Sequence, residues 1–228
     1  MFKRFFSKFK NNFTKIKLKP ITVFCLHHIS DSFDSSHMNP SDWMSLEEFK
    51  KKVMQLQNEG IQFISLSLAY NKLTQNFFRF KQYAVLTFDD GYASLKEILP
   101  WLELQNIPFV LFINGKYLDG KSYRKYSNEQ YLTRKELFAL DSELIEIGSH
   151  GYDHSDASIM NKEEFVMHIE KNIEVLQTHP CYIPFHAYTW GRHTEMTDNI
   201  LQSKRIIPVY IDGMKNYNTP IIVHRELL

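Results

Sequence analysis

Short apolar runs, separated by polar stretches, recur along most of the chain. A run of this kind that ends at turn residues is typical of a strand buried in a parallel sheet. Predicted strands lie at 21–26, 63–68, 84–89, 109–115, 144–147, 182–188, 206–211 and 221–223. Longer stretches between them predict helices, and strands that alternate with helices indicate parallel βα units. This number of strands fits a closed or nearly closed barrel, so we predict a single α/β domain.

Helix starts are predicted where a capping residue precedes an acidic residue by three positions, because the two can satisfy each other's backbone N–H groups. The pairs with this spacing are Ser45 with Glu48, Thr133 with Glu136, and Asn161 with Glu164. A further helix is predicted at 95–105, with a kink at Pro100 because proline cannot donate a helical hydrogen bond.

The predicted strand at 84–89 ends in two adjacent carboxylates, Asp89 and Asp90, and then Gly91. Ligands of parallel α/β proteins collect at the carboxyl ends of the strands. Asp-Asp-Gly alone is also an ordinary turn signal. The pair therefore becomes informative only together with a second polar cluster.

That second cluster follows the strand at 144–147, where Ser149 and His150 are followed four residues later by His154. An i, i+4 histidine pair lies on one face of a helical turn and can bind one metal through two nitrogens. With a carboxylate from elsewhere it forms a two-histidine, one-carboxylate site that leaves positions open for water and substrate. A lone pair of this spacing is more often an exposed surface feature. The combination with Asp-Asp-Gly favours a metal site.

The two motifs, TFDDG at 87–91 and SHGYDH at 149–154, resemble the first two motifs of the polysaccharide deacetylases, in the homology domain of the nodulation-type chitooligosaccharide deacetylases. The resemblance covers residues 21–228. It implies a deformed (β/α) barrel of about seven parallel strands. It also implies a metal-dependent hydrolase that removes N- or O-acetyl groups from sugars.

Transferred residue by residue, the resemblance implies that Asp90, His150 and His154 bind one divalent metal. Imidazole and carboxylate ligands favour zinc. Asp89 is implied to act as the general base that takes a proton from the attacking water. Adjacent residues at a strand end face opposite ways, so one can bind the metal while its neighbour reaches the water.

FHAYTWG at 185–191 resembles the third motif of the family. The backbone N–H of Trp190 aligns with the oxyanion donor of the family, and the rings of Tyr188 and Trp190 are suited to stacking on a sugar or, equally, to packing in the wall. Ala187 stands where many members have an arginine that orients the catalytic aspartate. The candidates to replace that arginine are Arg192, His186 and Arg225.

Two further histidines follow or lie in predicted strands. Leu26-His27-His28-Ile29 resembles a strand end in one branch of the family, with His27 either contacting substrate or bonded structurally. Near the end of the chain, His224 fits the apolar-apolar-His motif that supplies the general acid. Arg225 fits the apolar-Arg-aliphatic pattern of other members. The sequence leaves both pairs of alternatives open.

Charge is distributed unevenly. Residues 1–20 contain seven of the 27 basic residues and no acid, so the remainder has 20 basic against 26 acidic residues. Phenylalanines recur there at three- and four-residue steps between the lysines. We predict a basic amphipathic N-terminal segment that contacts an anionic membrane through residues 1–19, with a disordered tail or a helix docked on the body as alternatives. Nucleic-acid binding is not predicted, because the body is acidic.

Two cysteines, Cys25 and Cys181, fall in apolar runs and are expected to be buried thiols in a reducing compartment. No apolar run is long enough for a usual export signal. We therefore expect a cytoplasmic protein, peripheral at the inner membrane face, that acts on a lipid- or nucleotide-linked N-acetylhexosamine in surface glycan biosynthesis. The altered third motif keeps a non-catalytic carbohydrate-binding relative as the alternative. Deacetylation of an O-acetyl group or of another amide also stays open.

Overall fold

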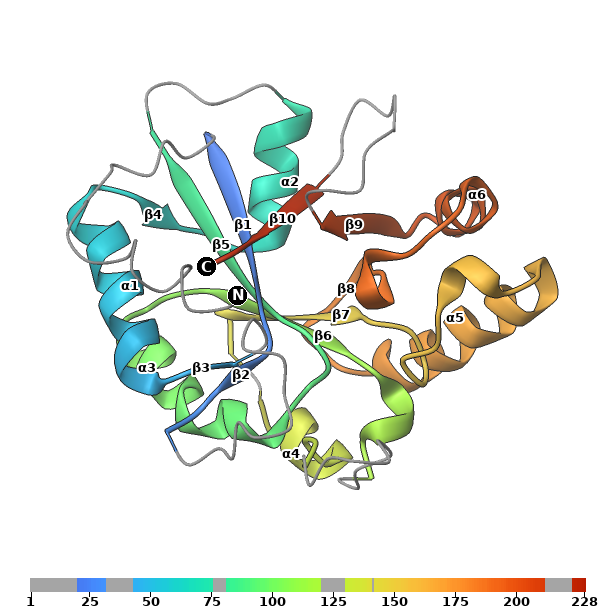
Figure 1. The fold of residues 1–228 in the computed structure, drawn as a ribbon, viewed down its shortest axis with the longest axis horizontal. Coiled ribbons are helices and arrows are strands. Elements are labelled where there is room, and N and C mark those ends of the chain that lie inside the picture. Colours follow the sequence, from blue (N-terminus) through green and yellow to red (C-terminus); the bar gives the residue numbers. More distant parts are fainter. Residues whose placement is uncertain (1–19, 32–42, 76–80, 120–129, 141, 212–222) are drawn as a thin grey trace, which may run out of the picture.

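The structure, a computed structural model, describes residues 20–31, 43–75, 81–119, 130–140, 142–211 and 223–228. Its main feature is one parallel sheet wound into a ring, with helices packed outside it (Figure 1). The predictions for residues 1–19 lie outside the described residues. The strands of this sheet are β1 (Ile21–Leu26), β4 (Gln62–Phe63), β5 (Tyr83–Phe88), β6 (Phe109–Ile113), β7 (Ile145–Ser149), β8 (Tyr182–Ala187), β9 (Ile207–Ile211) and β10 (Val223–Leu227). A separate short pair is formed by β2 (His28–Ile29) and β3 (Trp43–Met44).

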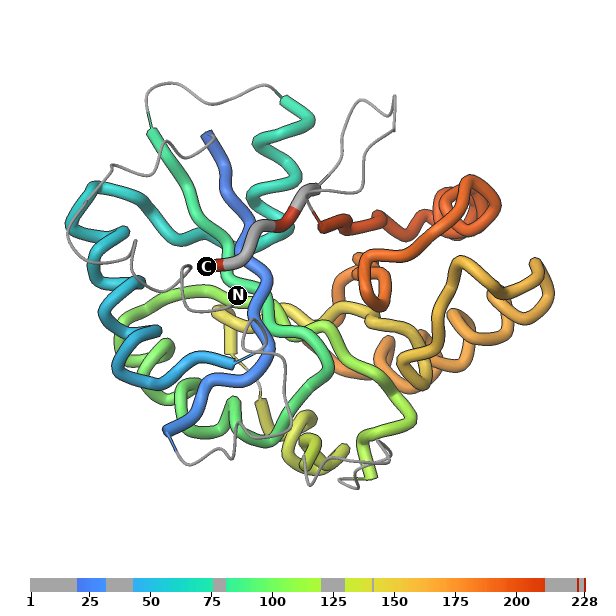
Figure 2. The backbone as a smooth tube through the Cα atoms, viewed as in Figure 1, coloured from blue at the N-terminus to red at the C-terminus, as the bar shows by residue number. Residues whose placement is uncertain are grey.

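Pairing runs around the ring in the order β1, β10, β9, β8, β7, β6, β5, and β5 pairs back to β1. The N-terminal and C-terminal strands are therefore neighbours, with Val23 beside Arg225, and Figure 2 follows the chain around the ring from blue β1 to red β9. β4 pairs only with the start of β5, where Phe63 lies beside Ala84. The predicted deformed (β/α) barrel of about seven parallel strands is confirmed.

The helices cover the outer face of the ring and one of its ends. They are α1 (Leu46–Asn58), α2 (Leu66–Thr74), α3 (Leu99–Leu104), α4 (Arg134–Phe138), α5 (Lys162–Leu176) and α6 (Glu195–Ser203). Short 3-10 turns occur at η3 (Ala93–Glu97), η4 (Gly115–Tyr117), η5 (Ala157–Ile159) and η6 (Thr189–Gly191). The predicted starts of α1, α4 and α5 are confirmed, with capping boxes at α4 and α5.

Two element predictions were wrong in part. The strand predicted at 63–68 is only the two-residue β4, because the Ser65 side chain accepts a hydrogen bond from the Leu68 N–H and starts α2 instead. The helix predicted at 95–105 is divided into η3 and α3. Pro100 lies in the first turn of α3, where backbone N–H groups form no hydrogen bond within the helix, so the lack of an N–H on proline costs nothing there. α6 was not predicted.

Alternate residues of each strand enter different packed regions, as the two-residue period of a strand requires. Ala84, Leu86 and Phe88 of β5 pack in the cluster shared with α1 and α3, outside the ring. Tyr83 and Val85 pack in a second cluster with α2, whose Leu66 and Ala69 close one end of the barrel. Thr87 and Asp89 continue this inner row toward the other end. The lumen therefore becomes polar where β5 ends.

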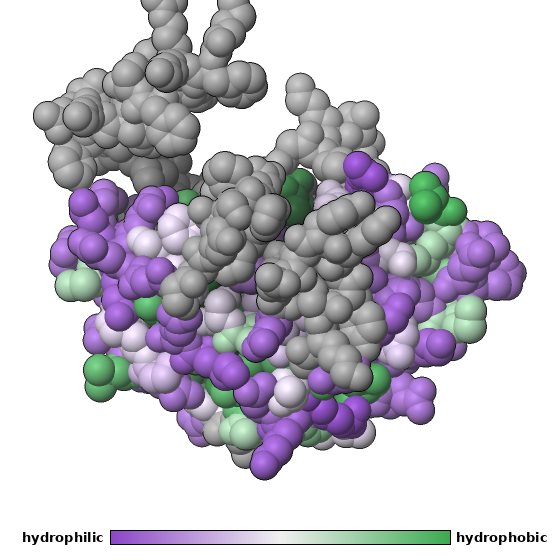
Figure 3. Space-filling model, turned by 60° about the horizontal axis from the view of Figure 1, so that its bottom comes forward, coloured by the Kyte–Doolittle hydropathy of each residue, from purple (hydrophilic) through white to green (hydrophobic). Residues whose placement is uncertain are grey.

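The face shown in Figure 3 is mostly hydrophilic over its described surface, with hydrophobic side chains in small groups. Within the described residues, no helix has both the length and the apolar character needed to span a membrane.

Candidate metal centre and its surroundings

Asp89 and Asp90 lie at the carboxyl end of β5, where the backbone turns sharply. Asp90 has φ 69° and Gly91 has φ 76°, both in the left-handed region that side chains rarely adopt. Glycine suits position 91 because a side chain is strained at this positive φ, and an added Cβ would also lie 2.7 Å from Ile113 Cδ1, which would have to shift. The turn directs the two carboxylates to different partners, as predicted from their adjacency.

Asp90 faces the two histidines of the second motif. Its Oδ1 lies 3.3 Å from His150 Nε2 and 3.0 Å from His154 Nε2. Asp90 and His150 are each 2% exposed, and His154 is 10% exposed. The spacing of the histidine pair suggested a helical turn, but the structure has none there. Gly151 and His154 both have positive φ, 81° and 60°, so a loop after β7 brings the two rings to Asp90.

His150 is held in the orientation that metal binding needs. Its Nδ1 donates to the Ala187 carbonyl over 2.8 Å, which leaves the lone pair of Nε2 directed at Asp90. Such a hydrogen bond fixes the tautomer of a metal-binding histidine. The His150 carbonyl in turn accepts from Asn114 Nδ2 at 2.7 Å and from the Thr189 hydroxyl at 3.3 Å.

The three side chains fit a divalent metal. Their ligand atoms all lie within 4.8 Å of one another. Ligands about 2.0 Å from a tetrahedral ion are roughly 3.3 Å apart, close to the two distances from Asp90 Oδ1. Burial raises the pKa of Asp90, but His154 and His150 outweigh it and hold that pKa well below its usual range. The donor set is an ionised carboxylate with two imidazoles.

Asp89 points into the lumen and contacts a buried arginine. Arg225 of β10 is fully buried, and its Nη1 donates to Asp89 Oδ1 and, at 3.3 Å, to the Thr87 hydroxyl. Burial raises the pKa of Asp89, but the charges of Arg225 and then His150 hold it below its usual range. This lowered pKa favours the ionised form of Asp89.

Arg225 is thus the one of the three candidates left open by the sequence that contacts Asp89. Arg192 instead donates to Asp156 at 2.8 Å. His186 Nδ1 lies 3.0 Å from the Ser149 hydroxyl. Only Arg225, of these candidates, contacts Asp89 directly, because β10 closes the barrel beside β1, and β1 in turn pairs with β5.

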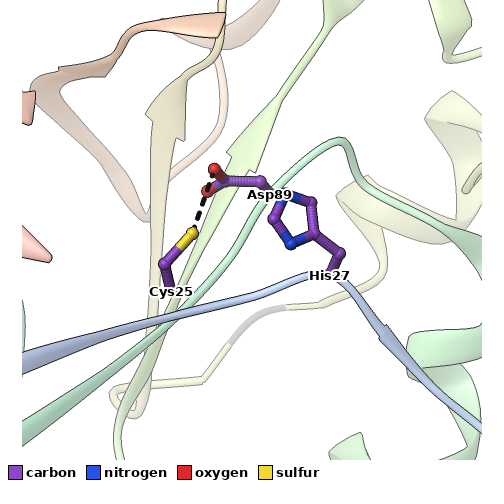
Figure 4. A group of neighbouring side chains, drawn as sticks. All are labelled: Cys25, His27 and Asp89. Carbon is purple, nitrogen blue, oxygen red and sulfur yellow. Dashed lines mark hydrogen bonds between the residues drawn. The ribbon is translucent and has the colours of Figure 1, made fainter. Parts of the chain in front are cut away.

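Two more groups from the end of β1 reach Asp89. The Cys25 thiol donates to Asp89 Oδ2 at 3.6 Å, and a ring nitrogen of His27 lies within 4.8 Å of an Asp89 oxygen; Figure 4 shows the three side chains together. His27, for which a substrate contact and a structural role were both left open, therefore lies next to Asp89, and its role stays a prediction. The His224 side chain lies outside the described residues, so its predicted role as general acid stays a prediction. The backbone of His224 pairs with Tyr210.

Trp190 and Tyr188, both predicted to stack on sugar, differ in position. Trp190 is 53% exposed, and its ring lies edge-to-face with His154 at 4.9 Å between centroids. Its backbone has φ 52°, an unusual conformation for a non-glycine residue. Tyr188 is 0% exposed and donates to Asp198 at 2.9 Å, so its ring offers no face to a sugar. Sugar stacking is therefore proposed below for Trp190 alone.

Sequence reasoning missed Asn172, which is fully buried on α5. Its Nδ2 donates to the Ile113 carbonyl at 2.9 Å and to Ser149 Oγ at 2.8 Å, and its Oδ1 accepts from the Gly115 N–H at 2.7 Å. It thereby ties the ends of β6 and β7 together next to His150. The only signal in the sequence was a polar residue at an inward-facing position of an amphipathic helix.

Comparisons with known proteins agree with this geometry. A family model described as polysaccharide deacetylase matches residues 79–206, more than half of the chain. That span includes Asp89, Asp90, His150, His154 and Trp190, but neither His27 nor Arg225. No curated protein matches the chain.

Several solved structures share the fold. The Streptococcus pyogenes deacetylase PplD, solved in complex with acetate, has a TM-score of 0.76 and 18% identity, covering 91% of this chain and 92% of that one. IcaB from Ammonifex degensii has a TM-score of 0.74 and 22% identity, covering 91% of each chain. A de-N-acetylase from Aggregatibacter actinomycetemcomitans has a TM-score of 0.73 and 17% identity, covering 91% and 94%. At these identities the likeness establishes the shared fold.

Proposed function

The chain belongs to the polysaccharide deacetylase family, and from that premise we propose that it removes N-acetyl groups from a hexosamine of a glycan or of a lipid- or nucleotide-linked glycan precursor. One observation supports this proposal above all others. Asp90, His150 and His154 converge on one point beside an ionised, lumen-facing Asp89. A binding module has no need for that second carboxylate.

Asp90, His150 and His154 would hold one divalent metal, and their chemistry favours zinc. The metal would lower the pKa of the attacking water and polarise the acetyl carbonyl. Asp89 would take the proton from that water. Arg225 keeps Asp89 ionised and fixes the direction of its carboxylate, so Arg225 is a positioning residue. The backbone N–H of Trp190 would donate to the carbonyl oxygen as it gains negative charge.

The leaving nitrogen needs a proton, and an imidazole is suited to supply it near neutral pH. His224 is the acid that the family motif predicts. His27 is a second candidate, because its ring lies beside Asp89 in the described part of the site. The products would be acetate and a free amino sugar. The exposed Trp190 ring would stack on the sugar next to the metal centre.

The substrate class is proposed from similarity and from charge. One similar structure is that of a de-N-acetylase, which supports an amide substrate over an ester. The basic, phenylalanine-rich residues 1–19 favour a substrate met at an anionic membrane surface. A lipid-linked precursor at the inner face of the membrane, used in surface glycan biosynthesis, agrees with both.

The test is metal content of the purified protein measured beside acetate release from a panel of N-acetylated and O-acetylated saccharides. We expect one equivalent of metal and release from N-acetylated members, both lost in His150→Ala. His179→Ala is the matched control, because His179 is a buried histidine that bonds the Leu137 carbonyl in another part of the fold. Metal-free wild-type protein that binds the saccharides without releasing acetate would instead establish a carbohydrate-binding relative.

A further inference from the structure

A second group of potential metal ligands meets at Asp89 Oδ2, the carboxylate oxygen that Arg225 does not contact. Cys25 Sγ, a ring nitrogen of His27 and an Asp89 oxygen lie within 4.8 Å of one another. Cys25 belongs to β1 and His27 follows it directly, so both reach the end of β5 from the neighbouring strand (Figure 4). This group shares no residue with Asp90, His150 and His154.

The spacing within this group suits zinc. Ligands about 2.3 Å (sulfur) and 2.0 Å (oxygen) from a tetrahedral ion are roughly 3.5 Å apart, and Cys25 Sγ lies 3.6 Å from Asp89 Oδ2. His27 Nδ1 is buried and has no hydrogen-bond partner among the described residues. In the tautomer that carries its proton on Nε2, this nitrogen has a lone pair free for a metal.

Arg225 does not occupy the same position. Its guanidinium contacts Asp89 Oδ1, whereas the thiol contacts Oδ2. An ion could therefore take the place of the proton that lies between Cys25 Sγ and Asp89 Oδ2, while the ion pair with Arg225 stays in place. Asp89 Oδ2 also lies 3.9 Å from His150 Nε2, so the two ligand groups are neighbours.

We propose that Cys25, His27 and Asp89 form a second, weaker zinc site, and that an ion bound there inhibits the enzyme. Binding exchanges the thiol proton, which leaves to solvent, for a zinc–sulfur bond. The ion then holds the carboxylate oxygen that a general base would need. The inhibition rests on the proposed function, whereas the binding of the ion does not.

Two features make this site weaker than the first. Burial raises the pKa of the Cys25 thiol, so an ion must displace a firmly held proton. The nearby guanidinium and the first ion both repel a second cation. The thiolate ligand also selects the ion, because sulfur favours zinc or cobalt over magnesium. Zinc above one equivalent is therefore expected to inhibit, and magnesium is not.

The experiment titrates the full chain with Co²⁺ and follows the near-ultraviolet charge-transfer band that only a thiolate ligand produces. We expect little band with the first equivalent and a strong band with the second. Cys25→Ser, which keeps a donor to Asp89, should abolish the band and retain the first equivalent. His27→Ala should weaken the second binding step by more than about tenfold.

Cys181→Ser is the matched control, because Cys181 contacts the Ser142 carbonyl, and this variant should retain the band. The proposal is overturned if excess Co²⁺ gives no thiolate band, or if the band disappears with Cys181 rather than Cys25. Acetate release is followed in the same titration, with each variant compared with its own one-equivalent rate. A thiolate band in a protein that releases no acetate would support the second metal site and contradict the proposed function.

Discussion

At the scale of single residues, the site uses backbone conformations that are costly. Five described non-glycine residues have positive φ, and three of them are Asp90, His154 and Trp190. Such conformations cost of order 1–3 kcal/mol each, so the surrounding contacts must stabilise them. The concentration of this strain on proposed ligands and on the proposed oxyanion donor indicates that position, rather than stability, governs these residues.

The two adjacent carboxylates are expected to respond differently to the same change. Asp89→Asn should keep the metal and lower kcat by about 10²–10⁴-fold, because it removes only the base. Asp90→Asn should lose metal and activity together, because it removes the charged ligand. Metal analysis and acetate release on both variants check this. Normal turnover by Asp89→Asn would assign the base to another residue.

Arg225→Ala should destabilise the protein by about 3–5 kcal/mol, because it leaves the Asp89 carboxylate buried without its cation. Urea unfolding of the protein measures this loss. In an Asp89→Asn background the same change should cost clearly less, since the amide carries no charge. Equal losses in the two backgrounds would show that the ion pair contributes nothing specific.

At the scale of elements, α5 positions the site through one buried polar residue. Asn172→Ala should lower the free energy of unfolding by about 2–5 kcal/mol, because the Gly115 N–H and the Ile113 carbonyl lose their partner. Chemical unfolding checks this value. Asn199→Ala, at an exposed position of α6, is the matched control and should be nearly neutral. A small loss at Asn172 would mean that water replaces its hydrogen bonds.

The start of α4 gives a prediction about pH. The Lys96 ammonium, together with hydrogen bonds from Thr133, lowers the pKa of Glu136 from 4.5 to about 2. A lowered folded-state pKa stabilises the protein above the unfolded value, and this contribution disappears as pH falls from 4.5 toward 2.

Glu136→Gln keeps the capping box but removes the charge. The stability difference between wild type and Glu136→Gln should therefore be constant above about pH 5 and shrink as pH falls toward 2. Thermal unfolding across this range measures the difference. In a Lys96→Met background the pH dependence should become smaller, with the part due to the Thr133 hydrogen bonds remaining. A difference that stays constant down to pH 2 would contradict the lowered pKa.

At the scale of the whole molecule, residues 1–20 hold seven basic residues and no acid, whereas the remainder has 20 basic against 26 acidic residues. The full chain should therefore bind anionic vesicles and release them as salt rises from about 0.1 to 1 M, because the screening length falls from about 10 to 3 Å. Vesicle co-sedimentation measures this. The combined changes Phe5→Ser, Phe6→Ser and Phe9→Ser should weaken binding to anionic vesicles. The unchanged protein should bind little to neutral vesicles. Salt-independent binding, or binding unaffected by these changes, would exclude the proposed contact.

Closure of the barrel also decides what meets at the site. β1 and β10 lie next to each other although they come from opposite ends of the chain. This places Cys25, Arg225 and Asp89 in one lumen, with α2 closing the far end. Among the described residues, the polar end of the lumen is therefore where β1 and β10, far apart in the sequence, both contribute side chains to the proposed chemistry.

The sequence by itself determined the local features. Apolar runs marked most strands, capping pairs marked the starts of α4 and α5, and two short motifs indicated Asp90, His150 and His154. These features depend on neighbours a few residues away, so the residue pattern contains them. Where a local signal had two interpretations, as at Ser65, the prediction was wrong, because a capping serine outweighed the apolar run around it.

Only the tertiary structure decided the long-range contacts. Arg225 could not be ranked above Arg192 or His186 from sequence, because its contact with Asp89 depends on β10 closing the ring beside β1. The pairing of β1 with β5 brings Cys25 to Asp89 across 64 positions of sequence. Burial of Tyr188 against Asp198 was likewise hidden, since an aromatic residue beside a site motif has the same sequence whether it faces solvent or the core.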